Sequence, residues 1–548
     1  MKTWRFEKWI GFIPLLSILI VHSEFLLAGE KVFDVTAYGA TGKIAEDART
    51  AIQSAIDACA AAGGGMVYLP PGQYTSGTLH LRSHVRFYLE AGATLYASPD
   101  PKAYDYGQIP SKAALIYGDN LENISIEGRG VVEGQAEYEW RPDDFERGYN
   151  HKIMMEKLGK PLQRSFPKGF PQREIFPHLL WLGNCKDVQI RGLTFLHSPS
   201  WTMAFYACEG MVIEGLYIYT SLKEAVWADG IDIDGCKDIR IANCRIETGD
   251  DCIIFISMDS WGPARLCENI TVTNCILSSA SAAVKFSEGN KLGVKNIAIN
   301  NCVITDTNRG FVFTTTMGGS ISDVVIANLT MDLHRYEWFW DGDGQPFYFR
   351  ITRLSEWNQE SPKPGEAPPG AIRNVMIHNV IAHAQGGSLI AGHPESWLDG
   401  VSFENIKLFL SADPTAPYEL TRHGMDFQWA RNLRLKDVEI KWEDPVAREW
   451  DSALSFDGVN NLTLEGFSGR PAWTDRDSPA IKFNNVSESM IGNSQALAGT
   501  GTFLKVSGTG SHGIYLLGND FRMARIPYEL DKEVAANAVG RLSNFPVE

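Results

Sequence analysis

The chain has no excess of positive charge. Its 548 residues contain 50 Lys and Arg but 66 Asp and Glu, which gives a formal net charge of −16 at pH 7. Such a surface repels nucleic acids and anionic membranes, so we expect neither as a partner. It also repels a polyanionic substrate at long range, so an acidic glycan would need local basic residues for binding.

The cysteines and histidines have none of the spacings that zinc sites require, and we expect no metal and no cofactor. Nine cysteines are present, an odd number. Stacked free thiols in a repeating core explain their positions better than a disulfide framework, with one or two bridges as the alternative in an oxidising compartment. Seven of them recur at repeat-related positions: Cys185, Cys208, Cys236, Cys244, Cys267, Cys275 and Cys302.

Beyond the first residues the chain lacks any apolar run long enough to span a membrane. Residues 1–28 have a basic start followed by the nearly uncharged run Trp9–Val21, and Ala28-Gly29 is a candidate cleavage site. The alternative is a membrane anchor, but the run is shorter than the roughly 20 residues needed to span. We therefore predict a signal peptide and a secreted or periplasmic protein.

What the chain does have is a repeated phrase, polar-Asn/Asp-apolar-x-apolar-x-Asn/Gly, at spacings of mostly 23 to 32 residues. The apolar positions alternate with period two, which indicates strands with one buried face. The closing Asn or Gly suits a tight left-handed turn. The eleven copies begin at residues 122, 186, 209, 237, 268, 295, 322, 373, 399, 431 and 460.

A strand that recurs about every 25 residues, with other short strands between, is one coil of a solenoid. We predict that residues 29–548 form one domain, an all-β, single-stranded right-handed parallel β-helix. We expect the protein to be a monomer. A β-sandwich is the alternative, but eleven echoes of one phrase argue against it. Residues 46–62 have helical periodicity and would cap the first coil. Insertions near 135–176 and 332–370 would form loops that shape a groove.

The segment Trp227–Ile254 carries the candidate chemistry. Asp229, Asp250 and Asp251 stand out, and Asp229 precedes Asp250 by 21 residues, which is about one coil. One coil returns the chain to the same side of the solenoid, so we expect the three carboxylates to lie together. Clustered carboxylates suit glycoside hydrolysis, because crowding raises at least one pKa and keeps one acid protonated. The alternative is that Asp in "DG" and "GDD" only makes turns, which we favour for Asp234 and Asp238.

The chain here resembles glycoside hydrolase family 28, the polygalacturonases and rhamnogalacturonan hydrolases. The likeness rests on VFDVTAYGA, GGGMVYLPPGQYTSGTLHL, HSPSWTMAFYACEGMVIEG, WADGID and Gly249-Asp250-Asp251. It implies a secreted glycosidase that hydrolyses O-glycosyl bonds of a pectic polysaccharide or oligosaccharide, with inversion. By the motif match, Asp250 would be the general acid, and Asp229 and Asp251 would position and deprotonate the water.

The sequence departs from the family pattern in three places. The first Asn of the family's Asn-Thr-Asp-Gly-Ile-Asp motif is Trp227 here, and its active-site histidine falls within Ala280–Ala282. The family's Arg-Ile-Lys stretch, which binds the uronate carboxylate, aligns with Val312–Thr314. Valine cannot replace a bidentate arginine. The resemblance therefore points to the rhamnogalacturonan branch or to an exo-acting member.

Other residues are candidates for substrate binding. Lys285 and Arg309 lie one and two coils beyond the aspartates, where they could carry charge to the same groove or simply be solvated. Trp201, Trp227 and Asp232 are the remaining candidates, with core packing as the alternative for Trp201. The aromatic run 336–349 lies in an insertion and is expected to stack on sugars rather than to join the core.

Two other classes of function remain open. A polysaccharide lyase uses the same solenoid, with acid-bound calcium and a basic residue, and Lys285 or Arg309 could imitate that arrangement. A non-catalytic glycan-binding solenoid is suggested by the missing histidine and arginine. Products separate the first two, because a lyase leaves an unsaturated uronate that absorbs ultraviolet light.

Overall fold

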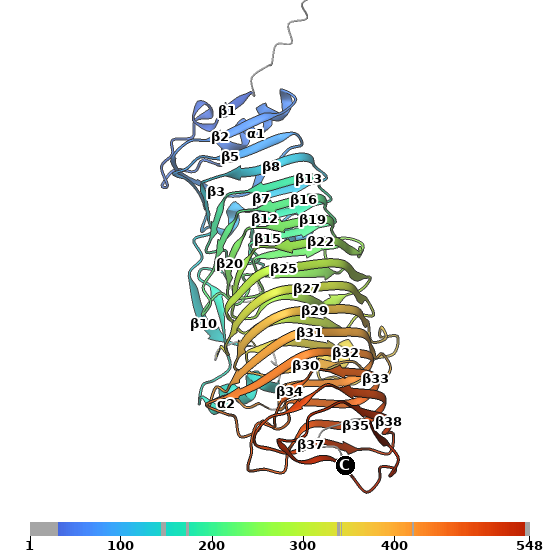
Figure 1. Ribbon diagram of the computed structural model, residues 1–548. Coiled ribbons are helices and arrows are strands. Elements are labelled where there is room, and N and C mark those ends of the chain that lie inside the picture. The colour runs from blue at the N-terminus through green and yellow to red at the C-terminus, as the bar shows by residue number, and fades with distance from the viewer. Residues whose placement is uncertain are drawn as a thin grey trace, which may run out of the picture.

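The computed structural model describes residues 31–143, 149–170, 175–336, 340, 342–418 and 421–542. The predicted signal peptide, residues 1–28, lies outside them. The described chain winds into a long column of parallel strands, with the N-terminal and C-terminal coils at opposite ends (Figure 1). No helix in the described ranges is both long and apolar enough to cross a membrane. The predicted parallel β-helix is confirmed.

All eleven repeat phrases fall in one ladder of parallel strands, because each supplies the same side of a coil. We call it the repeat ladder. Its strands are β1 (Val32–Asp34), β2 (Gly65–Leu69), β5 (Val85–Leu89), β8 (Glu122–Gly128), β13 (Lys186–Arg191), β16 (Glu209–Glu214), β19 (Lys237–Ala242), β22 (Cys267–Thr273), β25 (Gly293–Thr307), β27 (Ser320–Leu333), β29 (Ala371–Ala384), β31 (Leu398–Ser411), β32 (Met425–Glu443), β33 (Leu454–Glu465), β35 (Pro479–Gly492), β38 (His512–Leu517) and β40 (Val539–Leu542).

A second ladder, which we call the site ladder, precedes the repeat ladder in each coil. The first parts of β32, β33 and β35 continue it toward the C-terminus. Its other strands are β4 (Leu79–His80), β7 (Ala114–Asp119), β12 (His178–Gly183), β15 (Met203–Tyr206), β18 (Ile231–Asp234), β21 (Ile253–Ser257), β24 (Ala282–Asn290), β26 (Arg309–Thr315), β28 (Gln345–Ile351), β30 (Ser388–Ala391), β37 (Thr500–Ser507) and β39 (Ala524–Leu530).

A third ladder completes each coil. From β25 to β32 it is formed by the later halves of the long strands of the repeat ladder. Its separate strands are β3 (Gly72–Ser76), β6 (Ala93–Ala97), β9 (Val131–Glu133), β14 (Thr194–Leu196), β17 (Tyr217–Tyr219), β20 (Arg245–Thr248), β23 (Ile276–Ser279), β34 (Ser468–Gly469) and β36 (Gln495–Ala496).

The core is a continuous stack of inward-facing apolar side chains, one layer per coil. Phe286, Phe313 and Phe349 stack with ring centroids 4.1 Å apart at each step. Burying a side chain of this size stabilises the fold by roughly 1.5–3 kcal/mol. All nine cysteines are buried and free, which confirms the prediction of stacked thiols.

The asparagines that close the phrases behave as predicted, since Asn274 and Asn301 have left-handed φ angles of 56° and 54°. The second position of the phrase has the same backbone conformation. Asn269 and Asn296 have left-handed φ angles of 60° and 58°. Their side chains also form a ladder, because Asn296 donates to Asn269 at 2.7 Å and Asn269 donates to Asp238 at 2.9 Å. These bonds explain why Asn recurs at the turn in place of Gly.

The predicted cap is helix α1 (Arg49–Ala61), slightly shorter than the expected range 46–62. It buries Ile52 and Ile56 against the first coil and contacts β1, β2, β4 and β5. Asp47 accepts a hydrogen bond from the backbone N–H of Arg49 at 2.9 Å, which satisfies one free donor of the first turn. The other short helices are η1 (Val35–Tyr38), η2 (Pro101–Ala103), η3 (Pro110–Lys112), α2 (Tyr149–Lys157) and α3 (Leu354–Trp357).

The two expected insertions differ in structure. Range 135–176 contains α2 and an antiparallel hairpin of β10 (Tyr138–Pro142) and β11 (Gln163–Pro167), outside the coils. Range 332–370 contains β28, which pairs with β26 and β30 and is part of a coil. The expected insertion is therefore interrupted by a strand of the solenoid.

Candidate active site

Two consecutive turns bring the three aspartates together. Asp229 precedes β18, Asp250 and Asp251 precede β21, and these strands are neighbours in the site ladder. One carboxylate oxygen from each of the three lies within 4.8 Å of those from the other two. The backbone N–H of Asp251 donates to Asp250 at 3.0 Å and to Asp229 at 3.2 Å, which locks the arrangement. The side chains are only 1–7% exposed.

Lys285 lies one coil beyond them, on β24. Its Nζ is 3.2 Å from Asp251 Oδ2 and 3.2 Å from Glu288 Oε2. Burial opposes the charge of Lys285, but Asp251 and Glu288 outweigh it and raise the lysine pKa. Burial likewise opposes ionisation of Glu288, but Lys285 lowers its pKa below the ordinary value. Lys285 is therefore a fixed positive charge beside Asp251.

The other two carboxyl groups retain protons more strongly. Burial raises the pKa of Asp250 well above its ordinary value, and Asp251 raises it further. Burial raises the pKa of Asp229 too, with Asp250 as the next cause. The cluster thus contains acids in unequal environments, one beside a cation and two that favour the neutral form. Such a difference separates an acid from a base.

Asp232 is the innermost acid of the group. It lies between Ala204 and Ile254 in the site ladder and is fully buried. Neither of its oxygens has a hydrogen-bond partner among the described residues. Burial raises its pKa well above the ordinary value, and Asp251 and Asp250 add to that. Asp232 therefore favours its neutral form in the folded chain.

Arg309 begins β26, one coil beyond Lys285. Its guanidinium lies over the ring of Tyr348, 5.0 Å from the centroid. Tyr348 and Lys285 belong to the same outer row of the site ladder, in the order Lys285, Val312, Tyr348. The guanidinium of Arg309 therefore reaches Tyr348, which is two coils beyond Lys285 in this row. Its charge lowers the pKa of Asp343 against the larger effect of burial.

The hairpin β10–β11 supplies a residue that sequence reasoning missed. Arg164 is buried, and its guanidinium lies 3.1 Å from the centroid of the Trp227 ring. Its charge lowers the pKa of Asp250 against the larger effect of burial. Trp227 packs against Phe166, Phe170 and Phe176, so one ring face is covered by the hairpin. No periodicity in the insertion could have identified Arg164, and Glu288 lacked a signal too.

Trp201 is half-buried one coil before the site. Its ring lies 5.6 Å from that of Trp261 and 5.7 Å from that of His178. Thr202, the next residue, donates its backbone N–H to the carbonyl of Asp229 at 2.8 Å. Trp201 therefore borders the aspartates and belongs at the same time to an aromatic cluster.

The aromatic run 336–349 is described only in part, because residues 337–339 and 341 lie outside the described residues. Phe347 and Phe349 are fully buried in the core, because QPFYF alternates as a strand and forms β28. The prediction of sugar stacking is wrong for these two rings. Trp340 does reach the site, since its Nε1 donates to the carbonyl of Gly249 at 3.0 Å.

Comparisons with solved structures support the fold. An exopolygalacturonase from Thermotoga maritima aligns with a TM-score of 0.57 at 19% identity, covering 75% of this chain and 92% of that one. A family 28 exopolygalacturonase from Yersinia enterocolitica aligns with a TM-score of 0.58 at 18% identity, covering 80% and 79%. Identity at this level shows a shared architecture.

Comparisons with curated sequences and families go further. A probable polygalacturonase of Vitis vinifera is 26% identical over 371 residues, which is 64% of this chain and 68% of that protein. An exopolygalacturonase of Zea mays is 26% identical over 247 residues, 44% and 52% of the two chains. The matches thus span between about half and about two thirds of these relatives. The family model for glycosyl hydrolases family 28 matches residues 59–341. Since this match covers more than half of the chain, the protein belongs to glycosyl hydrolases family 28, the glycosidases to which the polygalacturonases belong.

Proposed function

We propose that this protein hydrolyses glycosidic bonds in a pectic polysaccharide or oligosaccharide of galacturonan or rhamnogalacturonan type. The supporting observation is the cluster of Asp229, Asp250 and Asp251, with Lys285 beside one member only. In glycoside hydrolysis a protonated acid donates to the leaving oxygen while an ionised one activates water. Asp250, whose pKa is raised by burial, is the candidate for the first role, and Asp251, which lies beside Lys285, is the candidate for the second.

Asp250 is the proposed general acid. Burial and the neighbouring Asp251 raise its pKa, so it holds a proton where an exposed aspartate would be ionised. Its proton passes to the glycosidic oxygen as the bond to the anomeric carbon breaks. The leaving sugar then departs as an alcohol, and Asp250 is left as a carboxylate.

Asp251 and Asp229 are the proposed groups that orient and deprotonate the water. Asp251 Oδ2 lies 3.2 Å from Lys285 Nζ, and we assign to Asp251 the acceptance of the proton from the water. Asp229 lies in the preceding turn, and its carbonyl oxygen can accept a hydrogen bond from the same water and so help to orient it, even when the carboxyl group is protonated. The water oxygen bonds to the anomeric carbon, and the released proton returns the site to its starting state.

We propose that this displacement inverts the anomeric centre. Inverting glycosidases commonly keep their carboxyl groups roughly 6.5–9.5 Å apart, to hold a water between them. The present cluster is tighter, so the water must lie beside the three acids rather than on an axis between two of them. The first product anomer, read by NMR, would be opposite to that of the cleaved bond. Retention would overturn this part of the proposal.

The proposed substrate carries carboxylates, and basic residues surround the acids. Lys285 and the newly found Arg164 lie near the aspartates, and Arg309 lies one coil beyond Lys285. The family's Arg-Ile-Lys stretch is replaced here by Val312–Thr314. Trp201, Trp227 and Asp232 complete the proposed binding residues. A pectic substrate fits a secreted or periplasmic location, which depends on residues 1–28.

We propose that the N-terminal side of the site is blocked, which would favour attack from chain ends. The support is a buried aromatic cluster on the outer face of the site ladder, which contains Trp181 and Trp261 and has Lys112 over Trp181 at 4.8 Å. With that side blocked, a glycan would extend toward the C-terminal coils. End attack would release mono- or disaccharides while the polymer's viscosity falls slowly. A rapid loss of viscosity with a ladder of oligomers would contradict it.

The test of the function is product analysis on polygalacturonan and rhamnogalacturonan, using the wild-type chain, Asp250→Asn and Asp238→Asn. We expect new reducing ends without ultraviolet absorption, a loss of roughly 1,000-fold or more with Asp250→Asn, and full activity with Asp238→Asn, an exposed turn residue. Absorbing products would identify a lyase. Unchanged turnover with Asp250→Asn would contradict the assignment of the acid.

A further inference from the structure

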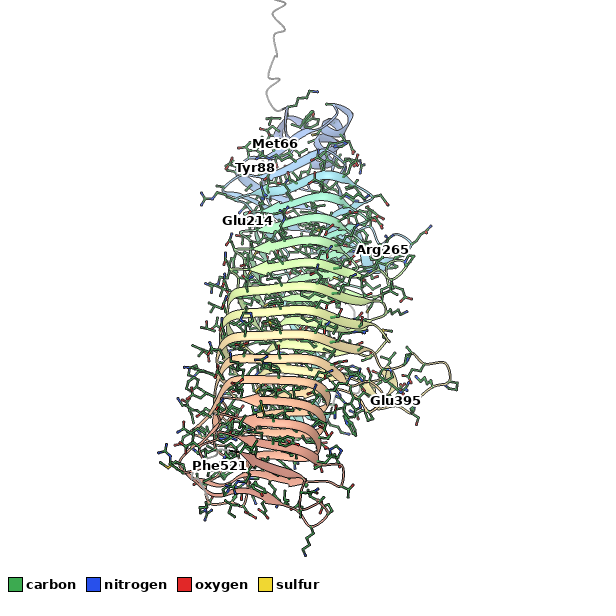
Figure 2. The ribbon with its side chains drawn as sticks, turned by 45° about the vertical axis from the view of Figure 1, so that its right-hand side comes forward. Met66, Tyr88, Glu214, Arg265, Glu395 and Phe521 are labelled. Atoms are coloured by element: carbon green, nitrogen blue, oxygen red, sulfur yellow. The ribbon has the colours of Figure 1, made fainter. Side chains whose placement is uncertain are left out.

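A hollow of about 660 Å³ lies on the side of the column, away from the aspartates. It is formed by the outer starts of β29, β31, β32, β33 and β35 in the repeat ladder, and by the loop after β30. Glu395 of that loop projects from the column in Figure 2. The hollow begins at β29, which follows β28, and β28 is three steps beyond β21 in the site ladder. At about 4.8 Å per step its near edge lies ~14 Å from the acids along the column, and Trp397, which follows β30, lies one step further.

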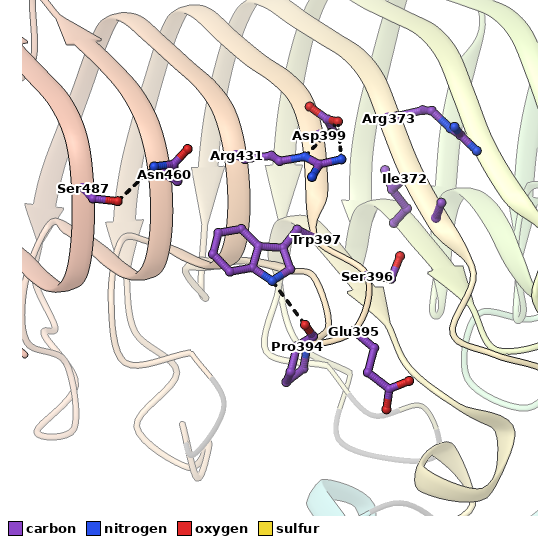
Figure 3. A pocket seen from close by; sticks show the side chains of 11 residues that line it. Ile372, Arg373, Pro394, Glu395, Ser396, Trp397, Asp399, Arg431, Asn460 and Ser487 are labelled. Atoms are coloured by element: carbon purple, nitrogen blue, oxygen red, sulfur yellow. Dashed lines mark hydrogen bonds and ion pairs between the residues drawn. The ribbon is translucent and has the colours of Figure 1, made fainter. Parts of the chain in front are cut away.

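Trp397 lies in the middle of this hollow (Figure 3). Its Nε1 donates to the carbonyl of Pro394 at 3.2 Å, which uses the single polar group of the side chain. What remains for a ligand is the half-buried ring. Faces of aromatic rings of this kind bind the apolar C–H faces of sugars.

Trp429 supports Trp397 from an unfavourable backbone position. The two rings contact edge to face at 5.9 Å. Trp429 has a φ of +51°, at the turn position that Asn184 and Gly235 occupy in earlier coils. Gly458 follows in the next coil, where an added Cβ would lie 2.9 Å from the Trp429 ring. A bulky residue in a left-handed turn is uncommon and marks a position kept for its side chain.

The charges around Trp397 are balanced except at one residue. Asp399 pairs with Arg431 at 2.9 Å, and Glu395 pairs with Arg353 at 2.5 Å. Arg373 has no hydrogen bond or ion pair among the described residues, and it is exposed at the rim. Its charge lowers the pKa of Asp399 only as a minor contribution, below the hydrogen bonds from Asn432 and Arg431. The hollow thus offers an aromatic face beside a guanidinium that can pair with a carboxylate.

We propose that this hollow is a second, non-catalytic site for an anionic glycan. A sugar ring would stack on Trp397, and Arg373 would pair with a uronate carboxylate. Asn460 and Ser487, which bond to each other at 2.9 Å, would offer polar contacts to hydroxyls further along the groove. The site uses none of the aspartates, so it would hold the polymer on the enzyme independently of hydrolysis.

The test is affinity electrophoresis of the full chain in gels containing polygalacturonan, with neutral galactan as the comparison polymer. All variants carry Asp250→Asn to prevent cleavage. We expect Trp397→Ala and Arg373→Gln each to weaken retardation by polygalacturonan about fivefold or more. Arg434→Gln should leave it unchanged, because Arg434 is an exposed arginine of β32 that does not line the hollow.

Equal retardation of Trp397→Ala, Arg373→Gln and their parent would overturn the proposal, as would equal binding to galactan that is insensitive to Arg373→Gln. Arg373 is exposed, so its replacement does not threaten folding. In the active background, hydrolysis of di- and trisaccharides should be unaffected by either change. A chain that hydrolyses nothing would contradict the proposed function yet leave the gel result interpretable.

Discussion

At the scale of single residues, the outcome depends on whether a side chain follows the repeat. Asp229, Asp250 and Asp251 could be placed from the sequence because a coil has a known length. Lys285 could be placed one coil beyond the aspartates for the same reason, and it contacts Asp251. Glu288 completes that ion pair but shares no pattern with its partners, so only coordinates reveal it.

Asp232 gives a prediction about stability and pH. Its pKa is raised in the folded chain, so folding favours the protonated form, and the stability it contributes falls as pH rises above about 4, the value in an unfolded chain. Asp232→Asn keeps the shape without the charge. We expect it to raise the free energy of unfolding at pH 8 by about 1–3 kcal/mol, with little change near pH 4. Thermal or urea unfolding at both pH values measures this.

The control for that experiment is Asp238→Asn, an exposed aspartate whose replacement should change stability equally little at either pH. A gain for Asp232→Asn that is as large at pH 4 as at pH 8 would mean that packing, not charge, is responsible. A loss at pH 8 would mean that the carboxylate is stabilised in a way the described contacts do not include.

Lys285 gives a prediction about catalysis. Its charge lowers the pKa of Asp229 and Asp250, so Lys285→Gln should raise both. The alkaline side of the pH–activity profile, where Asp250 must stay protonated, would then move to higher pH. The acid side of the profile, where the base must be ionised, would move to higher pH as well. We expect kcat to fall about tenfold or more, with the pH optimum shifted upward.

The measurement is kcat/KM as a function of pH on a pectic oligosaccharide. Lys291→Gln is the matched control, since Lys291 pairs with Asp259 at 2.5 Å on the surface. A uniform loss at every pH, without a shift of either limb, would show that Lys285 serves only to maintain the structure.

At the scale of elements, the sequence predicts what is periodic and misses what is not. The eleven phrases locate one ladder, and the helical run 46–62 locates α1 within three residues. The other two ladders carry shorter strands without a shared phrase. Strand β28 lies in a range that the sequence predicts as an insertion, because its coil is lengthened on both sides. For the same reason the sequence predicts sugar binding for aromatic residues that belong to the core. The hairpin β10–β11 has no repeat partner at all.

The cap gives the prediction at this scale. Ile52 is fully buried between α1 and the first coil, so Ile52→Ala leaves a cavity there. We expect a loss of about 2–4 kcal/mol in the free energy of unfolding of the N-terminal coils, detected by urea denaturation or hydrogen exchange. Ser54→Ala on the exposed face should be nearly neutral. Equal protection of the first coils in both variants would exclude a capping role.

At the scale of the whole molecule, the solenoid separates tasks along one axis. The N-terminal coils carry the cap and the aromatic cluster that contains Trp181 and Trp261. The middle coils carry the acids, and the later coils carry the hollow around Trp397. Because each coil contacts mainly its neighbours, these parts are linked by spacing rather than by shared residues. A linear polymer is the kind of ligand that such spacing suits.

The net charge of −16 gives the last prediction. A polyanionic substrate is repelled at long range and attracted only by local cations such as Lys285 and Arg373. Salt screens the long-range repulsion first, because the Debye length falls from about 30 Å at 0.01 M to about 8 Å at 0.15 M. We therefore expect KM for polygalacturonan to fall several-fold over that range of sodium chloride, with kcat nearly constant. A neutral pectic substrate should show no such change. A KM that rises with salt would mean that the local cations, and not the net charge, govern the approach of the polymer.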